Sequence, residues 1–390
     1  MHAEPQPSPI RTTEANWFAS NTMRYRLPKN IKNIVASNPD LSPADARRLD
    51  ALGESIAGNE AIPALTPPAP DYDEWMEQYE PHAGERWHDT EWFFGETYAF
   101  RLILEACRYW ERGRDPFFYI KQRELDDGVA FDPVRSFSDV QASDPVDPRE
   151  SLVRALHAST WGNRSDLSFS AGGELDRRAG DAALLIVNDD TVIVDDILAT
   201  SAPVHIVMDN SGAELAGDLI LALELVQRGL DVVLHLKVHP TYVSDTTVGD
   251  FHHFLETAIG HEDPRVYRYG RALEEAFENA RIKLAPDSFW CSTWFMADMP
   301  TRVRRVLGNA GMVIIKGDLN YRRVMRDTIW PADTPAAAAS GGLDLAAVAL
   351  LRIMKSDVTW GIPRETEAAL DAEDPEWRTD GRRGVIQRLR

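Results

Sequence analysis

Short apolar runs alternate with helical patterns in the second half of the chain, and this alternation restricts the possible fold more than any other feature. A long amphipathic pattern covers residues 213–228, and further helical patterns lie within residues 249–282. The strand-length apolar runs are residues 182–187, 191–196, 204–209, 231–238 and 312–318. Strands that are apolar throughout and separated by helices indicate a parallel sheet covered on both faces. We therefore expect an α/β domain over residues 161–363, a Rossmann-like three-layer α/β/α arrangement with a mostly parallel sheet.

The preceding part of the chain has a helical character. Ser42 followed by Pro43 is a strong helix-start signal, with the serine as N-cap and the proline at the first helical position. We expect residues 16–160 to form a mainly helical domain packed on the α/β domain. Residues 1–15 are Pro-rich and polar and are expected to be a flexible lead, and residues 364–390 a charged, peripheral tail.

Charge and cysteine content exclude several classes of function. The formal net charge of the 390 residues is −20. Nucleic acids and anionic membranes attract basic faces, so neither is expected as a partner, but a small phosphorylated ligand needs only a few local cations. The only cysteines, Cys107 and Cys291, cannot form a disulfide framework and favour a reducing interior. With no apolar leader and no run of 18 apolar residues, we expect a cytoplasmic protein.

Polar side chains follow three of the predicted strands. Asp209 and Asn210 end one run, Asp245 lies in the loop after the next, and Lys316-Gly317-Asp318 ends the last. The carboxyl ends of parallel strands meet at one edge of a sheet, and Asp and Asn oxygens suit Mg²⁺ or Mn²⁺. The helix that follows Asn210 would also point its first N–H groups at a bound anion. These features together predict a site that binds a divalent cation and a phosphate.

Each of these features also has a purely structural interpretation. Asp-Asn-Ser-Gly at a strand-to-helix junction is good turn and capping chemistry without any metal, Asp245 could be a helix cap, and Lys316-Gly317-Asp318 could be a turn. The chain has no P-loop and no G-x-G-x-x-G sequence, which argues against nucleotide or dinucleotide binding by those routes. The residue spacing alone leaves both interpretations open.

Several motifs, however, resemble those of a known family. The segments VMDNSGAEL, YVSDTTVGDF and IIKGDLNYR are similar, in the same order, to signatures of the damage-control phosphatase family, in its third subfamily. WGNRSDLS, WFFGETYAFRLI and FASNTMRYRLP also follow that family's pattern. The resemblance extends from about residue 18 to residue 362, and it implies a helical N-terminal domain on an α/β domain.

The resemblance also implies roles for individual residues. A divalent cation, with Mn²⁺ favoured and Mg²⁺, Co²⁺ or Ni²⁺ as alternatives, would be held by Asp209, Asn210 and Asp245. A subfamily motif near the end of the domain corresponds to Arg352–Lys355, where Lys355 would contact substrate and Ile353 stands in place of Thr. The implied substrate-contacting segment is Asp318, Leu319, Asn320, Tyr321 and Arg322.

On this basis we expect a metal-dependent phosphatase that hydrolyses a small phosphorylated metabolite, a sugar phosphate such as fructose 1-phosphate. Asp209 and Asn210 would act through the cation, and Asp318 would orient water or act as general base. Two alternatives stay open: a carboxyl methyltransferase that uses S-adenosylmethionine, and a non-catalytic metabolite-binding relative. The sequence gives no indication of the oligomeric state. The candidate contacts to phosphate or sugar are Lys355, Lys316, Arg322, Glu96 and Asn163.

Overall fold

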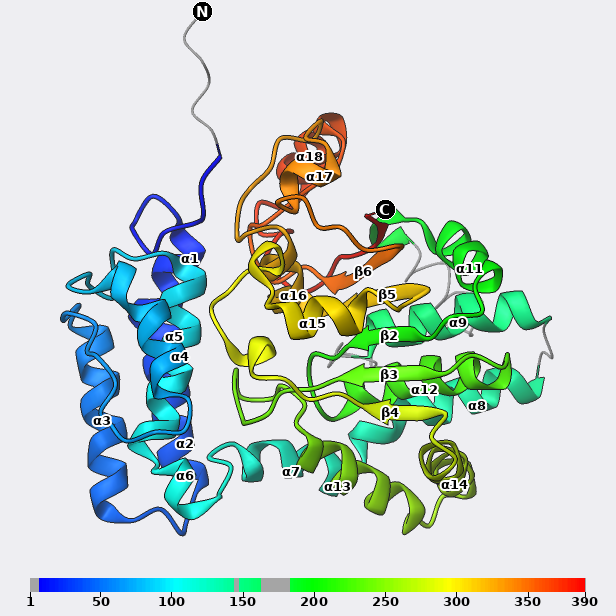
Figure 1. The fold of residues 1–390 in the computed structure, drawn as a ribbon, viewed down its shortest axis with the longest axis horizontal. Helices are drawn as coiled ribbons and strands as arrows, with labels where there is room; N and C mark the ends of the chain where they lie inside the picture. Colours follow the sequence, from blue (N-terminus) through cyan, green and yellow to red (C-terminus); the bar gives the residue numbers. More distant parts are fainter. Residues whose placement is uncertain (1–6, 144–146, 163–182, 390) are drawn as a thin grey trace, which may run out of the picture.

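The computed structural model describes residues 7–143, 147–162 and 183–389. A layer of helices from the first part of the chain stands beside a sheet that carries helices on both faces (Figure 1). The layer at the left of Figure 1 consists of α1 (Trp17–Asn21), α2 (Leu27–Ser37), α3 (Pro43–Ala57), α4 (Tyr72–Tyr79), α5 (Trp92–Ala106) and α6 (Tyr109–Arg112), with a π-helical segment, Thr22–Arg26, between α1 and α2. As predicted, Ser42 caps α3 by accepting from the N–H of Asp45.

The sheet has seven strands in the order β1-β7-β6-β5-β2-β3-β4. Every neighbouring pair is parallel except β6 and β7, so the predicted α/β class with a mostly parallel sheet is confirmed. The strands are β1 (Leu185–Asn188), β2 (Val204–Val207), β3 (Val232–His235), β4 (Ile282–Leu284), β5 (Met312–Lys316), β6 (Val348–Ile353) and β7 (Gly384–Arg388).

Alternate strand residues point to opposite faces of the sheet, and each face has its own hydrophobic core. On one face, Ile206 and Ile314 pack against α8, α9 and α12, together with α11, α13 and α14. On the other face, Val207 and Ile315 join a core that continues into the layer of α1 to α5. The remaining helices are α7 (Phe118–Asp126), α8 (Asp132–Ser143), α9 (Pro148–Trp161), α11 (Asp190–Ala199), α12 (Ala213–Gln227), α13 (Val248–Ile259), α14 (Pro264–Glu278), α15 (Thr301–Leu307), α16 (Gly317–Val324), α17 (Ala336–Ala339) and α18 (Arg364–Glu373).

Three local expectations were wrong. Residues 191–196, predicted as a strand, belong to α11, because Ile193, Val194 and Ile197 are buried at helical spacing. The predicted charged tail includes β7, whose residues 384–387 are buried between β1 and β6. Of the predicted flexible lead, residues 1–15, the structure describes residues 7–15, and these are anchored at Ile10, whose N–H donates to the carbonyl of Asp327 and whose carbonyl accepts from the N–H of Trp92.

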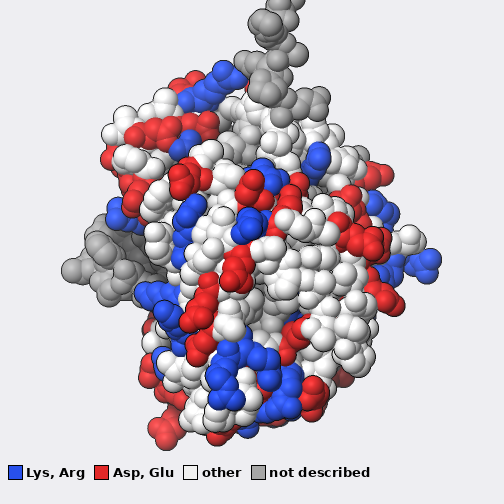
Figure 2. Space-filling model, turned by 90° about the vertical axis from the view of Figure 1, so that its left-hand side faces the viewer, with Lys and Arg blue, Asp and Glu red and all other residues white. Residues whose placement is uncertain are grey.

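Acidic and basic side chains are interspersed over the outer face of the helical layer (Figure 2). Arg48, Arg108 and Arg112 all pair with the buried carboxylate of Asp45, which neutralises part of the positive charge in this layer. None of the described helices combines the length and the apolar character that crossing a lipid bilayer requires.

Candidate functional site

The site lies where the order of the strands reverses. After β2 the chain proceeds through β3 and β4 on one side, and then returns to place β5 on the other side of β2. The loops that leave β2 and β5 therefore diverge, and in open α/β sheets ligands bind in the crevice between such loops, at the carboxyl ends of the strands. Asp209 and Asn210 follow β2, and Gly317 and Asp318 follow β5.

A cavity of about 290 Å³ occupies this crevice and is lined by both parts of the molecule. The helical layer contributes Phe18, Arg26, Trp92 and Glu96. The loops and strand ends of the α/β part contribute Asp209, Asn210, Glu214, Tyr242, Ser244, Asp245, Gly317, Asp318, Leu319, Arg322, Ile353 and Lys355.

The predicted metal ligands are brought together by a short antiparallel pairing between Asn210 and Asp245. The backbone N–H of Thr246 donates to the carbonyl of Asp209 over 2.8 Å, and the N–H of Ser211 donates to the carbonyl of Ser244 over 2.7 Å. The hydroxyl of Ser244 donates to the Oδ1 atom of Asn210 over 2.7 Å, which turns the amide oxygen toward the Asp245 loop. The pairing thus fixes the loop after β2 to the loop after β3.

Gly317 allows the carboxylate of Asp209 to lie against the start of α16. Its φ of +83° is a left-handed conformation, and an added Cβ would lie 1.9 Å from the Oδ2 atom of Asp209. A side chain at position 317 would therefore displace Asp209 as well as strain the backbone.

Negative charge is concentrated in this cavity. Burial, with the carboxylates of Glu214 and Asp245, raises the pKa of Asp209 well above its ordinary value. Burial also raises the pKa of Asp245, although the ammonium of Lys237, 3.1 Å from its Oδ2 atom, opposes the shift. A cation bound between Asp209 and Asp245 would offset this repulsion, and their oxygens are ligands that hard divalent ions prefer. The donor set therefore fits a divalent cation.

This donor set contains two carboxylates and one amide. In the part of the chain that the structure describes, no group of three His, Cys, Asp or Glu side chains is placed to hold a metal ion. The third protein ligand that the resemblance implies beside Asp209 and Asp245 is the amide oxygen of Asn210.

Asp318 is held in a fixed orientation at the edge of the cavity. Its Oδ1 atom accepts hydrogen bonds from the side chain of Arg352 (2.6 Å), the backbone of Lys355 (3.1 Å) and the hydroxyl of Ser356 (3.1 Å). Arg352 is buried and stacks over the ring of Tyr321 at 4.3 Å. The donors gather on one oxygen, so the other oxygen of Asp318 is left to accept from a ligand or a water.

Of the other predicted contacts, Lys355, Leu319, Arg322 and Glu96 line the cavity. The guanidinium of Arg322 is already paired with Glu96 at 2.8 Å and with Asp327 at 2.7 Å, and it lies over the ring of Trp92. Within the described residues, the ammonium of Lys355 has no carboxylate within ion-pair distance, so Lys355 is the freer of the two cations.

Three predicted contacts lie behind the cavity rather than in its lining. Lys316 is buried, and its ammonium contacts Glu214 at 3.3 Å, Asp218 at 3.1 Å and the carbonyl of Ser159 at 2.6 Å. The amide of Asn320 donates to the carbonyls of Met208 and Lys316, which joins the ends of β2 and β5. The hydroxyl of Tyr321 donates to Gln387 on β7. Asn163 lies outside the described residues.

Sequence reasoning missed several residues that line the cavity. Glu214 accepts from the amide of Asn210 over 2.9 Å, and its position four residues after Asn210, in the first turn of α12, was a usable signal. Ser244 adjoins Asp245 and could have been found in the same way. Phe18 and Arg26 come from the helical layer, and the resemblance of FASNTMRYRLP, which contains both, to the family pattern was the available signal.

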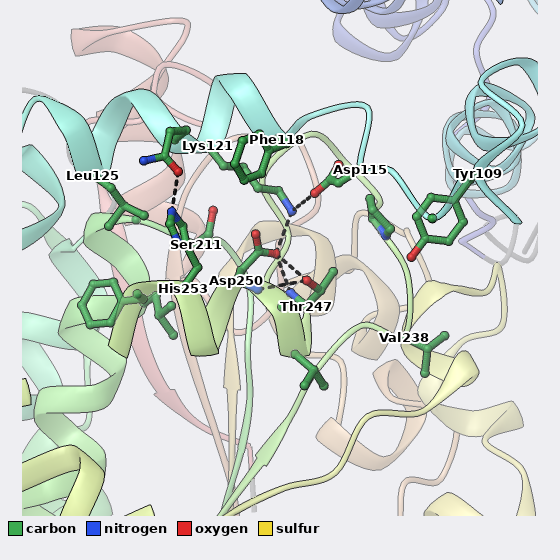
Figure 3. Close-up of a pocket in the computed structure, with 18 residues that line it drawn as sticks. Tyr109, Asp115, Phe118, Lys121, Leu125, Ser211, Val238, Thr247, Asp250 and His253 are labelled. Carbon is green, nitrogen blue, oxygen red and sulfur yellow. Dashed lines mark hydrogen bonds and ion pairs between the residues drawn. The ribbon is translucent and has the colours of Figure 1, made fainter. Parts of the chain in front are cut away.

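A second cavity, of about 310 Å³, lies on the other side of the loop after β2, where Ser211 and Gly212 line it (Figure 3). The ammonium of Lys121, which lines this cavity, points between the carboxylates of Asp115 and Asp250, at 3.0 and 2.7 Å. The same ammonium donates to the backbone carbonyl of Asp245 over 3.3 Å. Lys121 thus supports the Asp245 loop from behind, with its charge fully paired.

Comparisons with known proteins identify the family of this chain. The family model for the damage-control phosphatase ARMT1-like domain matches residues 22–370. Damage-control phosphatase ARMT1 of Danio rerio is 26% identical over 95% of this chain and 94% of its own length, and that of Rattus norvegicus is 29% identical over 77% and 75%. A solved DUF89 family protein from Pyrococcus horikoshii covers 94% of this chain and 98% of its own, with 14% identity and a TM-score of 0.48. The chain belongs to the damage-control phosphatase family, in its ARMT1-like branch.

Proposed function

We propose that this protein is a metal-dependent phosphatase that hydrolyses a small phosphorylated metabolite. The observation that carries the proposal is the convergence of Asp209, Asn210 and Asp245 in one cavity with the ammonium of Lys355, which pairs with no carboxylate of the described residues. Family membership supports phosphatase activity. The dependence on a metal and the identity of the substrate are our proposals.

Asp209, Asn210 and Asp245 would hold the cation, which would neutralise phosphate charge and acidify a bound water. The pairing between Asn210 and Asp245 keeps these ligands in place before substrate enters, so little reorganisation is needed during the reaction. Lys355 provides a mobile positive charge that can follow the phosphoryl oxygens as charge develops on them.

Asp318 has the geometry of a proton acceptor. Three donors fix its Oδ1 atom, so its second oxygen can accept a proton from the attacking water without loss of those bonds. Arg352 is itself buried and stacked on Tyr321, which holds Asp318 in this orientation.

The size and the lining of the cavity favour a small polyol phosphate such as fructose 1-phosphate. A cavity of about 290 Å³ is at the lower end for ligand sites, which suits a single sugar ring. Glu96 and Asp318 present acceptors to the hydroxyl groups of such a ligand. Ile353, in place of the Thr that the resemblance implied, makes this wall more apolar.

The test is hydrolysis of fructose 1-phosphate and of a generic aryl phosphate by the parent and by Asp209→Ala, with Mn²⁺ present. We expect Asp209→Ala to lower kcat by at least about 10²-fold, because electrostatic stabilisation is often the largest single term in catalysis. Glu262→Ala, an exposed acid on the α13–α14 turn, serves as the matched control and should match the parent.

Activity of Asp209→Ala within a few-fold of the parent would overturn the proposal. Mn²⁺ binding without turnover of a broad panel of phosphometabolites would instead indicate a non-catalytic relative. Stabilisation by S-adenosylmethionine alone, with methyl transfer to a carboxylate, would indicate the methyltransferase alternative.

A further inference from the structure

Arg26 is the cavity-lining cation that the helical layer contributes. It ends the π-helical segment Thr22–Arg26, immediately before α2. Arg322 and Lys355, the other cations of the lining, both come from the α/β part. Arg26 therefore brings to the cavity a positive charge that comes from the helical layer.

The guanidinium of Arg26 has only weak contacts with the described residues. Its contacts are the hydroxyl of Thr22 at 3.5 Å and the ring of Phe18 at 4.9 Å, and no carboxylate among the described residues pairs with it. Arg24, two residues earlier, is by contrast paired with Glu14 at 3.3 Å and bonded to Ser20 at 3.0 Å. In a cavity with several carboxylates, an arginine that pairs with none of them is available to a ligand.

An aromatic wall holds Arg26 at the cavity. Phe18 meets the ring of Trp92 edge-on at 5.7 Å, and Trp92 in turn carries the guanidinium of Arg322 at 3.5 Å. Cations and aromatic rings thus alternate along this wall, from the exposed Arg26 to the buried Arg322. Stacking on Phe18 restricts the Arg26 side chain and so reduces the entropy that binding a ligand would cost.

We propose that Arg26 binds the phosphoryl group of the substrate together with Lys355, an inference that rests on the proposed function. A phosphate monoester carries up to two negative charges near neutral pH, and these two cations are the unpaired positive charges of the described lining. Arginine presents two parallel N–H groups to phosphate oxygens, which lysine does not. The substrate would then bridge the helical layer and the α/β part.

The test is a titration with inorganic phosphate in the presence of Mn²⁺, followed by calorimetry, for the parent, Arg26→Ala, Arg26→Lys and Arg24→Ala. Loss of a charge-assisted hydrogen bond predicts that Arg26→Ala weakens phosphate binding roughly 10- to 100-fold. Arg26→Lys should give an intermediate value because it keeps the charge without the fork. Arg24→Ala, the matched control, should bind like the parent.

Turnover provides a second readout. Arg26 contacts the phosphoryl group in both ground and transition states, so Arg26→Ala should raise the KM for fructose 1-phosphate by a similar factor while kcat changes little. Thermal unfolding should match that of the parent, because Arg26 is exposed and makes no ion pair with the described residues.

The outcomes separate the two proposals. An unchanged phosphate affinity and KM in Arg26→Ala, with an active parent, would overturn this inference and leave the proposed function standing. A parent that hydrolyses no phosphomonoester would overturn the proposed function, and the phosphate titration, which needs no turnover, would still decide whether Arg26 binds the anion. A parent that binds no phosphate would overturn the inference outright.

Discussion

The Oδ2 atom of Asp209 lies 1.9 Å from the point where a Cβ at position 317 would be, so the carboxylate of Asp209 occupies the space that a side chain at position 317 would need. The carboxylate that follows β2 is thereby pressed against the backbone that follows β5. Asp209 can hold this position only if residue 317 has no side chain.

Gly317→Ala should therefore remove activity with Mn²⁺ and weaken Mn²⁺ binding, because the added methyl group displaces the carboxylate of Asp209. Gly229 has the same φ of +83° but open space around its Cβ position, so Gly229→Ala reproduces the backbone strain alone. Both variants should lose roughly 1 kcal/mol of unfolding free energy from the left-handed conformation. Calorimetric titration with Mn²⁺ distinguishes them, and equal Mn²⁺ affinity in the two variants would show that Gly317 has no role at the site.

Lys121 should stabilise the loop that carries Asp245 and so affect the binding of Mn²⁺ there. Lys121→Met removes the contact with the carbonyl of Asp245 and leaves Asp115 and Asp250 without their shared cation. Breaking a buried pair of this kind costs on the order of 3–5 kcal/mol, and we expect Mn²⁺ affinity to fall as well. Denaturant unfolding and Mn²⁺ titration measure the two effects.

Lys283→Met is the control for Lys121, since Lys283 forms an exposed pair with Asp231 at 3.4 Å. An exposed pair contributes about 1 kcal/mol or less. A Lys121→Arg variant should recover part of the Mn²⁺ affinity by restoring the charge. Full Mn²⁺ affinity in a folded Lys121→Met variant would mean that the Asp245 loop holds its geometry unaided.

A pair of buried histidines should make stability depend on pH. His205 on β2 and His235 on β3 share a hydrogen bond of 2.9 Å, and burial lowers the pKa of His205 to about 4 and that of His235 to about 3. Their pKa in the unfolded chain is about 6.5, so the unfolded chain binds more protons between these values. The free energy of unfolding should therefore fall as the pH drops from about 6.5 toward about 4.

The double variant His205→Leu/His235→Leu removes both partners and both titrations. Urea unfolding at about pH 7 and about pH 5 should show a smaller loss of stability in the double variant than in the parent. The same loss in both proteins would assign the pH dependence to other groups.

The side-chain direction of Lys316 is a feature that the sequence analysis did not predict. The strand ends and their convergence followed from the alternation of strands and helices, so Asp209, Asn210 and Asp245 met in one cavity as expected. Lys316, however, is still within β5, and the two-residue period of a strand places it on the same face as Met312 and Ile314, toward α9 and α12. Asp318, which lies beyond the strand, reaches the cavity.

Tertiary packing decided the other differences. The β-branched residues of 191–196 favour a strand locally, but burial of one side of α11 stabilises the helix. Residues 384–386 form a short apolar run among polar and charged residues, so the membership of β7 in the sheet depends on partners far away in the sequence. Arg26 likewise reaches the site only because the helical layer packs beside the sheet.

The pairing of β1 with β7 has a consequence for how the chain acquires its structure. Within the described strands, β1 hydrogen-bonds only to β7, a partner about two hundred residues later in the sequence. During synthesis residues 185–188 therefore lack their strand partner until residues 384–388 have left the ribosome. Contacts over such a separation slow folding, so the completion of this edge of the sheet, next to the strand that leads to Lys355, is expected to be a late event.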